Sequence, residues 1–188
     1  MFDVDGFVGD CLTAVRDPEP RLAVKDLLDR TMAHRDEVAA GLPATDVALT
    51  TLHQSPELTV LNVVWPPGYV INPHEHQMFA AIGIYRGQED NAFFRRTGPR
   101  IEPAGGRTLH EGDVAVLGHD VVHSVANPLS SSTGALHVYG GDLFAPARKN
   151  WGLETLEEIE GAFDPRSRTT GVPPAHDTGD RIRGDSWR

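Results

Sequence analysis

The chain changes its hydrophobic period near residue 43. Before that point, apolar residues recur at helical spacing and predict two helices, a loose one over residues 1–17 and an amphipathic one over residues 21–40. Asp17-Pro18-Glu19-Pro20 separates them, and Gly41-Leu42-Pro43 ends the second. The apolar stripe of the second helix consists of Val24, Leu27, Leu28, Met32 and Val38. Residues 1–43 therefore predict a helical N-terminal extension.

After residue 43 the chain consists of short runs rich in β-branched and aromatic residues. They lie at residues 47–52, 58–65, 78–85, 92–94, 107–109, 114–117, 121–125 and 135–139. Turn-forming Gly, Pro, Asn and Asp residues separate these runs, and no helical pattern lies between them. Many short strands at this spacing predict an all-β fold, either an antiparallel sandwich or a barrel, over residues 44–145.

The last part of the chain, residues 146–188, has a different composition. Leu153, Leu156, Ile159 and Phe163 predict one short C-terminal helix. Residues 164–188 are rich in Pro, Gly, Arg, Asp and Thr with few apolar side chains, which predicts a loosely ordered tail.

Charge and composition narrow the classes of function. The formal net charge of −10 argues against a nucleic-acid partner, because phosphate binding needs a positive face. The sequence contains no run of about 20 apolar residues that could span a membrane. The first residues lack the pattern of a signal peptide, so we expect a cytoplasmic protein. The single cysteine, Cys11, excludes an intramolecular disulfide and a cysteine-based metal site, and we expect it to be a small buried apolar residue.

Three histidines are the main candidates for functional residues. His74 and His76 are two positions apart, and successive side chains of a strand alternate in direction, so both imidazoles point into one space. His123, from a distant strand, would complete a three-nitrogen site for a first-row divalent metal. The alternative interpretation is that the histidine pair only lines a polar cavity.

The glycines around these histidines resemble the two motifs of the cupins. Gly68, His74, His76 and Gly87 have the layout of the first motif, and Gly112, Gly118, His123 and Asn127 that of the second. The resemblance covers residues 48–139 and implies a double-stranded β-helix, or jelly roll. Most cupins carry a glutamate separated from the second histidine by three or four residues, where this chain has Ala80 and Ala81. The resemblance therefore implies a metal held by three neutral histidines and no protein carboxylate.

Within the cupins, the segment Ala135-Leu136-His137-Val138-Tyr139 resembles the cysteine dioxygenase family of thiol dioxygenases. That family oxidises small thiols to sulfinic acids at non-haem Fe(II) and has a Ser-x-His-x-Tyr strand. The resemblance implies that His137 orients the Tyr139 hydroxyl as a catalytic pair, with Ala135 in place of the serine. Trp65 lies nine residues before His74, where the family often has a tryptophan.

Substrate-binding residues are less clearly marked. The family's cysteine-using members bind the substrate carboxylate with an early arginine, and residues 49–53 contain none. Arg95 and Arg96 alternate in direction, so one of them could reach inward if the strand continues. Met78 alternates with Phe79 and is a candidate for the pocket wall. For His119, four residues before His123, we expect a surface position.

Three functions are compatible with these patterns. The leading hypothesis is an Fe(II) dioxygenase acting on a small thiol and O2. A metal-dependent cupin enzyme for a non-thiol molecule, with Fe(II) or another first-row metal, is the second, and a wide apolar pocket would favour it. The third is a metal- or ligand-binding cupin sensor without catalysis. A homodimer is compatible with each.

Overall fold

The protein begins with three helices. The computed structural model describes residues 1–42, 49–145 and 147–160, and the helices are α1 (Val4–Ala14), α2 (Pro20–Met32) and α3 (Arg35–Gly41). The prediction of one continuous helix over residues 21–40 was therefore wrong. His34 leaves the helical conformation, with φ −116° and ψ 33°, and the chain turns there. The turn keeps Val38 in the same buried apolar cluster as Leu28 and Met32.

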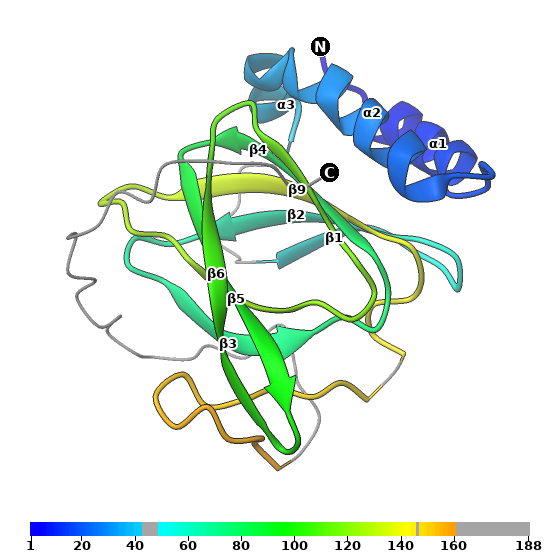
Figure 1. The fold of residues 1–188 in the computed structure, drawn as a ribbon. Coiled ribbons are helices and arrows are strands. Elements are labelled where there is room, and N and C mark those ends of the chain that lie inside the picture. The colour runs from blue at the N-terminus through cyan, green and yellow to red at the C-terminus, as the bar shows by residue number, and fades with distance from the viewer. Residues whose placement is uncertain (43–48, 146, 161–188) are drawn as a thin grey trace.

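Nine strands follow within the described residues, all paired antiparallel (Figure 1). They are β1 (Leu49–Gln54), β2 (Thr59–Trp65), β3 (Val70–Glu75), β4 (Ala80–Arg86), β5 (Gln88–Thr97), β6 (Arg100–His110), β7 (Val114–Leu117), β8 (Val122–Ala126) and β9 (Thr133–Tyr139). One sheet has the order β1-β2-β9-β4-β7 and the other β3-β8-β5-β6. Gly87, with φ +81°, makes the tight turn between β4 and β5.

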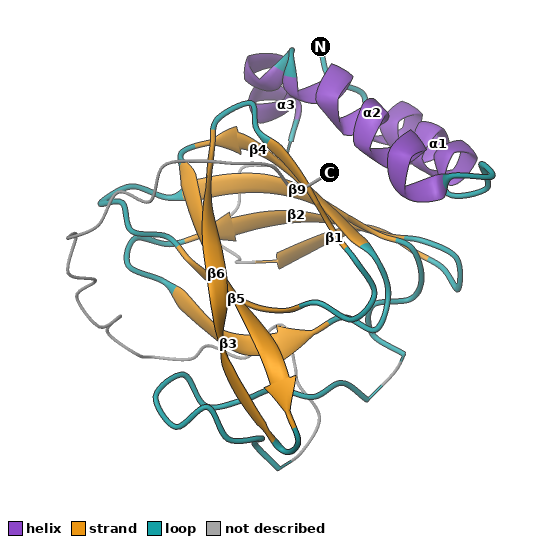
Figure 2. Ribbon diagram, in the orientation of Figure 1, coloured by secondary structure: helices purple, strands orange, loops and turns teal. Residues whose placement is uncertain are grey.

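The five-stranded sheet is covered on both faces. All seven residues of β2 and of β9 are buried, which explains their continuous apolar runs. On one face, Leu61 and Val63 pack in the interior between the sheets. On the other face, Val60 and Leu136 pack under the helices, which lie together on that side of the sandwich (Figure 2). Gly83 allows the close approach of α2, because a Cβ there would meet Met32 Cγ at 3.0 Å.

The chain after β9 does not form the predicted C-terminal helix within the described residues. Residues 147–160 form turns and isolated bridges, pairing His74 with Asn150 and Arg100 with Glu157. Trp151 and Leu156 pack beside Ile101 instead of forming one face of a helix. Phe163 and the tail predicted for residues 164–188 lie outside the described residues.

The architecture confirms the predicted fold class. Two antiparallel sheets face each other around an apolar interior, as in a cupin β-sandwich of the jelly-roll type. Among the described residues, no helix is long and apolar enough to cross a membrane.

Candidate metal centre

The structure brings the three histidines together as their spacing predicts. His74 lies on β3, directly opposite His123 on β8. His76 follows the end of β3, and Gln77 then turns the chain with φ +57°. The side chains at 74 and 76 share one side of the strand, whereas Glu75 between them points the other way.

The ligand atoms converge to a single point inside the protein. His76 Nε2 lies 3.2 Å from His74 Nε2 and 3.3 Å from His123 Nε2. One ring nitrogen from each histidine lies within 4.8 Å of the others, and all three side chains are buried. Imidazole nitrogens this close are suited to coordinating one ion.

Burial keeps these imidazoles neutral. It lowers the pKa of His74 to about 4, and the positive charge of Arg148 adds to the shift. The pKa values of His76 and His123 are also lowered well below the usual range, first by burial and then by neighbouring histidines. Neutral imidazoles are the protonation state that binds metals.

Contacts outside the cluster orient two of the imidazole rings. His74 Nδ1 lies 2.8 Å from the Asn72 carbonyl oxygen, and His123 Nδ1 lies 2.8 Å from Asn91 Oδ1. Both oxygens accept hydrogen bonds, so each Nδ1 carries the hydrogen and each Nε2 lone pair faces the cluster. The buried His76 Nδ1 has no hydrogen-bond partner in the described part of the chain. The donor set fits a first-row divalent cation.

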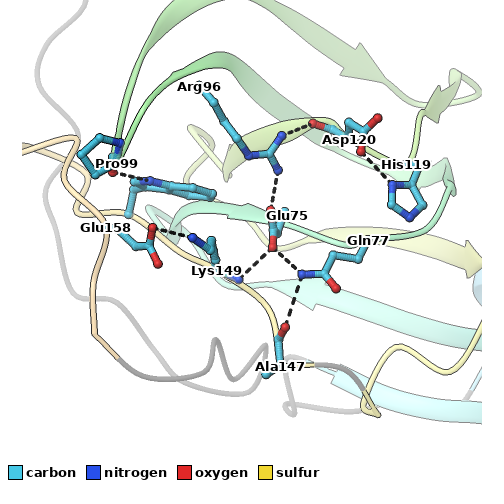
Figure 3. A network of polar contacts seen from close by, with 10 residues as sticks. Glu75, Gln77, Arg96, Pro99, His119, Asp120, Ala147, Lys149 and Glu158 are labelled. Atoms are coloured by element: carbon cyan, nitrogen blue, oxygen red, sulfur yellow. Dashed lines mark hydrogen bonds and ion pairs between the residues drawn. The ribbon is translucent and has the colours of Figure 1, made fainter.

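The acidic residue between the histidines serves a different purpose. Glu75 pairs with Arg96, accepts the Lys149 backbone N–H at 3.1 Å and accepts Gln77 Nε2 at 2.6 Å (Figure 3). Burial alone would raise the pKa of Glu75, but these hydrogen bonds lower it below its ordinary value. Among the described residues, the metal-ligand cluster contains three histidines and no carboxylate.

The His137 and Tyr139 pair lies beside this cluster. Both side chains are buried on β9, with the Tyr139 hydroxyl 3.0 Å from His137 Nδ1. The Tyr139 ring packs edge-on against His76, with 5.1 Å between ring centroids. Burial and the negative charge of Glu89 raise the pKa of Tyr139, so its hydroxyl stays protonated.

Sequence reasoning missed Glu89. Its side chain on β5 is fully buried, with Oε2 2.9 Å from Trp65 Nε1 and 3.6 Å from His137 Nε2. Its Oε1 accepts a hydrogen bond from Asn91 Nδ2 at 3.0 Å. Burial would raise the pKa of Glu89, but the surrounding donors outweigh it and the pKa falls below its usual value. Residues 88–91 are all polar, so no alternation of apolar residues marked Glu89 as an inward position.

Arg148 was also missed, because its segment was expected to belong to the C-terminal part of the chain beyond the barrel. The 147–151 segment instead runs antiparallel beside β3, with Glu75 N–H donating to the Lys149 carbonyl and Trp151 N–H to the Pro73 carbonyl. This register places Arg148 opposite His76, and paired residues share one face of a sheet. Arg148 is 4% exposed while the adjacent Lys149 is exposed, so the buried arginine lies on the histidine side.

A small enclosed cavity lies at the cluster, with a volume of about 20 Å³. Its polar end is formed by the three histidines, His137 and Tyr139, and Trp65 is part of the wall. The remaining wall is aliphatic: Leu49, Leu61, Val63, Ile71, Val125 and Leu143. A cavity of this size holds about one water molecule, so it leaves no room for a bulky molecule.

The other predicted substrate residues lie elsewhere. Arg95 is exposed and pairs with Glu102. Arg96 points to the outer side, where it pairs with Glu75 and lies 5.7 Å from the Trp151 ring centroid. Met78 is buried in the core but is not part of the cavity wall. His119 is exposed beside Asp120, as expected.

Comparison with known proteins adds likenesses of fold. No model of a known protein family matches the sequence. A variant of oxalate decarboxylase from Bacillus subtilis is 21% identical, with a TM-score of 0.40, over 48% of this chain and 23% of that chain. An RmlC-like cupin family protein from Methanocaldococcus jannaschii, with a double-stranded β-helix fold, is 14% identical, with a TM-score of 0.45, over 54% of this chain and 89% of that one. The region matched thus spans less than a quarter of the oxalate decarboxylase chain.

The strand topology and the side chains inside it define the class of fold and the kind of site. The chain forms a cupin-type β-sandwich whose interior holds a three-histidine cluster suited to a divalent metal.

Proposed function

We propose that this protein is a non-haem Fe(II) dioxygenase that oxidises a small, negatively charged thiol to a sulfinic acid. The reaction R–SH + O2 → R–SO2H transfers four electrons from sulfur to dioxygen and needs no further reductant. The observation that carries the proposal is the Tyr139 hydroxyl, bound to His137 and packed against His76 at a small enclosed cavity.

Three neutral imidazoles would hold the metal. Fe(II) bound by His74, His76 and His123 would supply the Lewis-acid and redox chemistry that a reaction between a thiolate and dioxygen needs. Because the cluster contains no carboxylate among the described residues, the double positive charge of the cation is not compensated there. A site of this charge favours an anionic sulfur ligand.

The Tyr139 and His137 pair would accept the proton that the thiol loses on binding. The Tyr139 hydroxyl oxygen accepts the thiol hydrogen while its own proton passes to His137 Nδ1, 3.0 Å away. The raised pKa of Tyr139, caused by burial and by Glu89, opposes a free phenolate, so both transfers occur together. The proton comes to rest on His137, whose Nε2 faces the Glu89 carboxylate.

Arg148 would bind the acidic group of the substrate. Its buried positive charge lies close enough to His74, His76 and Tyr139 to lower the pKa of each, beside the larger effect of burial. Its position opposite His76 supports a location on the same face as the histidines, beside the small cavity rather than in its wall. A guanidinium binds a carboxylate through two parallel hydrogen bonds, which favours a thiol that carries a carboxylate.

The cavity argues against a bulky substrate. A bulky non-thiol substrate would need a wide apolar pocket, whereas the space at the histidines is about 20 Å³.

An oxygen-uptake assay tests the proposal. Protein loaded with Fe(II) under anaerobic conditions should consume O2 with 3-mercaptopropionate or cysteine and form one sulfinate per O2, measured by mass spectrometry. Cysteamine, which lacks the carboxylate, should react more slowly. Failure to consume O2 with every member of a broad thiol panel would contradict the proposal.

A pair of histidine variants tests the metal ligands separately. His123→Ala should lose bound iron, whereas His119→Ala removes an exposed histidine four residues earlier and should keep it. Because loss of an outer-shell partner alone weakens metal binding by about 10- to 100-fold, loss of a ligand should weaken it further. Equal iron content in the two variants would remove His123 from the site.

A further inference from the structure

Glu89 lies between two parts of the site. One part is His123, the candidate metal ligand, and the other is His137, which contacts Tyr139. Its Oε1 accepts from Asn91, which contacts His123. Its Oε2 accepts from Trp65 and faces His137. The groups around this carboxylate are the nitrogens of Asn91, Trp65 and His137, and an ionised carboxylate only accepts hydrogen bonds.

The contact of Glu89 with Asn91, the first branch, sets the tautomer of His123, the candidate metal ligand. Asn91 uses its Nδ2 to donate to Glu89 Oε1 at 3.0 Å, which leaves Asn91 Oδ1 facing His123 Nδ1 at 2.8 Å. An amide oxygen accepts, so His123 carries its hydrogen on Nδ1 and presents the Nε2 lone pair to the cluster.

The contact of Glu89 with His137, the second branch, sets the tautomer of that histidine. His137 Nε2 lies 3.6 Å from Glu89 Oε2, slightly beyond the length of an ordinary hydrogen bond. Because a carboxylate only accepts, the tautomer with its hydrogen on Nε2 is the one that suits Glu89 at this distance. The opposite nitrogen, Nδ1, is then the acceptor for the Tyr139 hydroxyl at 3.0 Å. Ala135, two residues before His137 on β9, has no polar side chain to offer this ring.

We propose that Glu89 is a positioning residue that couples the two halves of the site, because one carboxylate fixes the tautomers of both His123 and His137. Its catalytic consequence rests on the proposed function: the same residue prepares His123 to bind metal and His137 to receive the proton of Tyr139. The sequence motifs named the two histidines but not the residue that joins them.

The replacement Glu89→Gln separates the two branches. A glutamine has one accepting oxygen and one donating NH2 group, so it satisfies only one branch. If its NH2 faces Asn91, that amide turns over and presents its own NH2 to His123, which moves the hydrogen to Nε2, toward the metal. If its NH2 faces His137, the ring accepts on Nε2, carries its hydrogen on Nδ1, and no longer accepts from Tyr139.

Long-range ¹H–¹⁵N correlation spectra of the metal-free protein test this inference, since they distinguish the two tautomers of each histidine. The wild type should show hydrogen on Nδ1 of His123 and on Nε2 of His137. In Glu89→Gln the tautomer of one of the two histidines should change. Glu89→Asp retains an accepting carboxylate, so both histidines should keep their wild-type tautomers. Glu102→Gln, an exposed replacement on the neighbouring strand, is the control and should leave both unchanged.

Measurements of metal binding and of kcat show which of the two branches, to His123 or to His137, is lost in the variant. Loss of the His123 branch should weaken metal binding by about 10- to 100-fold, and loss of the His137 branch should lower kcat at equal metal content. Unchanged tautomers of both histidines in Glu89→Gln would overturn the inference. If that variant does not fold, a wild-type spectrum with His137 carrying its hydrogen on Nδ1 overturns it equally.

These spectra need no iron, thiol or O2. A protein that oxidises no thiol but shows the tautomer change would contradict the proposed function and support the coupling. Thiol oxidation with unchanged tautomers would support the proposed function and contradict the coupling.

Discussion

Glu75 and Lys149 hold two separate segments of the chain together: Glu75 N–H donates to the Lys149 carbonyl at 3.2 Å, and Lys149 N–H donates to Glu75 Oε1 at 3.1 Å. The same carboxylate pairs with Arg96 (Figure 3). A residue between two candidate metal ligands thus fixes the segment that carries Arg148. This arrangement links the histidine strand to the proposed anion-binding residue.

Replacing Glu75 with glutamine should weaken that link. We expect KM for a carboxylate-bearing thiol to rise about 3- to 10-fold with kcat within about two-fold, because the change loosens Arg148 without altering the histidines. Steady-state oxygen uptake measures both constants. Glu102→Gln, which breaks the exposed ion pair with Arg95, should change neither; a fall in kcat alone for Glu75→Gln would argue against this role.

Arg148→Met should remove the preference for acidic thiols. The loss of charged hydrogen bonds worth about 1.5–3 kcal/mol should lower kcat/KM for 3-mercaptopropionate by roughly 10- to 100-fold, with little effect on cysteamine. Competition between the two thiols measures the preference directly. Arg95→Met, at an exposed position, is the matched control. An unchanged preference in Arg148→Met would exclude this residue as the anion site.

Tyr139→Phe should lower kcat while iron binding persists. The phenyl ring keeps the packing against His76 but removes the hydroxyl group bound to His137. Loss of a positioned proton-transfer group should cost about 100-fold or more in kcat, measured at equal iron content. Variant kinetics equal to the wild type would leave Tyr139 with a packing role only.

The stability of the metal-free protein should depend on pH through the buried histidines. Burial lowers the pKa of His74 from 6.5 to about 4, so between these values the unfolded chain binds more protons than the folded one. The free energy of unfolding should therefore rise with pH across this range and level off above it. From about pH 5 to 6.5, His74 alone should contribute on the order of 1 to 2 kcal/mol. Urea denaturation at a series of pH values measures the free energy of unfolding. His74→Gln should make its rise with pH shallower, whereas His119→Gln should not.

The sequence predicted the features that arise from strand alternation. Side chains two apart on a strand share a face, which brought His74 and His76 together and placed His137 beside Tyr139. Apolar runs marked strands such as β2 and β9 because both of their faces are buried. Cys11 is fully buried among the helices, as predicted for a small apolar residue, and burial raises the pKa of its thiol to about 12.

The remaining residues of the site depend on pairing between distant segments. Glu89 lies opposite the core residue Leu109 in the pairing of β5 with β6, and local sequence carries no sign of which polar residue of 88–91 is enclosed. Arg148 depends on the pairing of the 147–151 segment with β3, a contact between residues more than 70 positions apart. The helix break at His34 likewise follows from packing on the sheet rather than from a helix-breaking residue.

X-ray absorption at the iron edge tests the central claim most directly. Protein loaded anaerobically with one Fe(II) should show three imidazole ligands, and addition of 3-mercaptopropionate without O2 should add one sulfur neighbour. A carboxylate-rich iron site, or no sulfur neighbour at saturating thiol, would contradict the assignment of His74, His76 and His123 as the iron-binding site of a thiol dioxygenase.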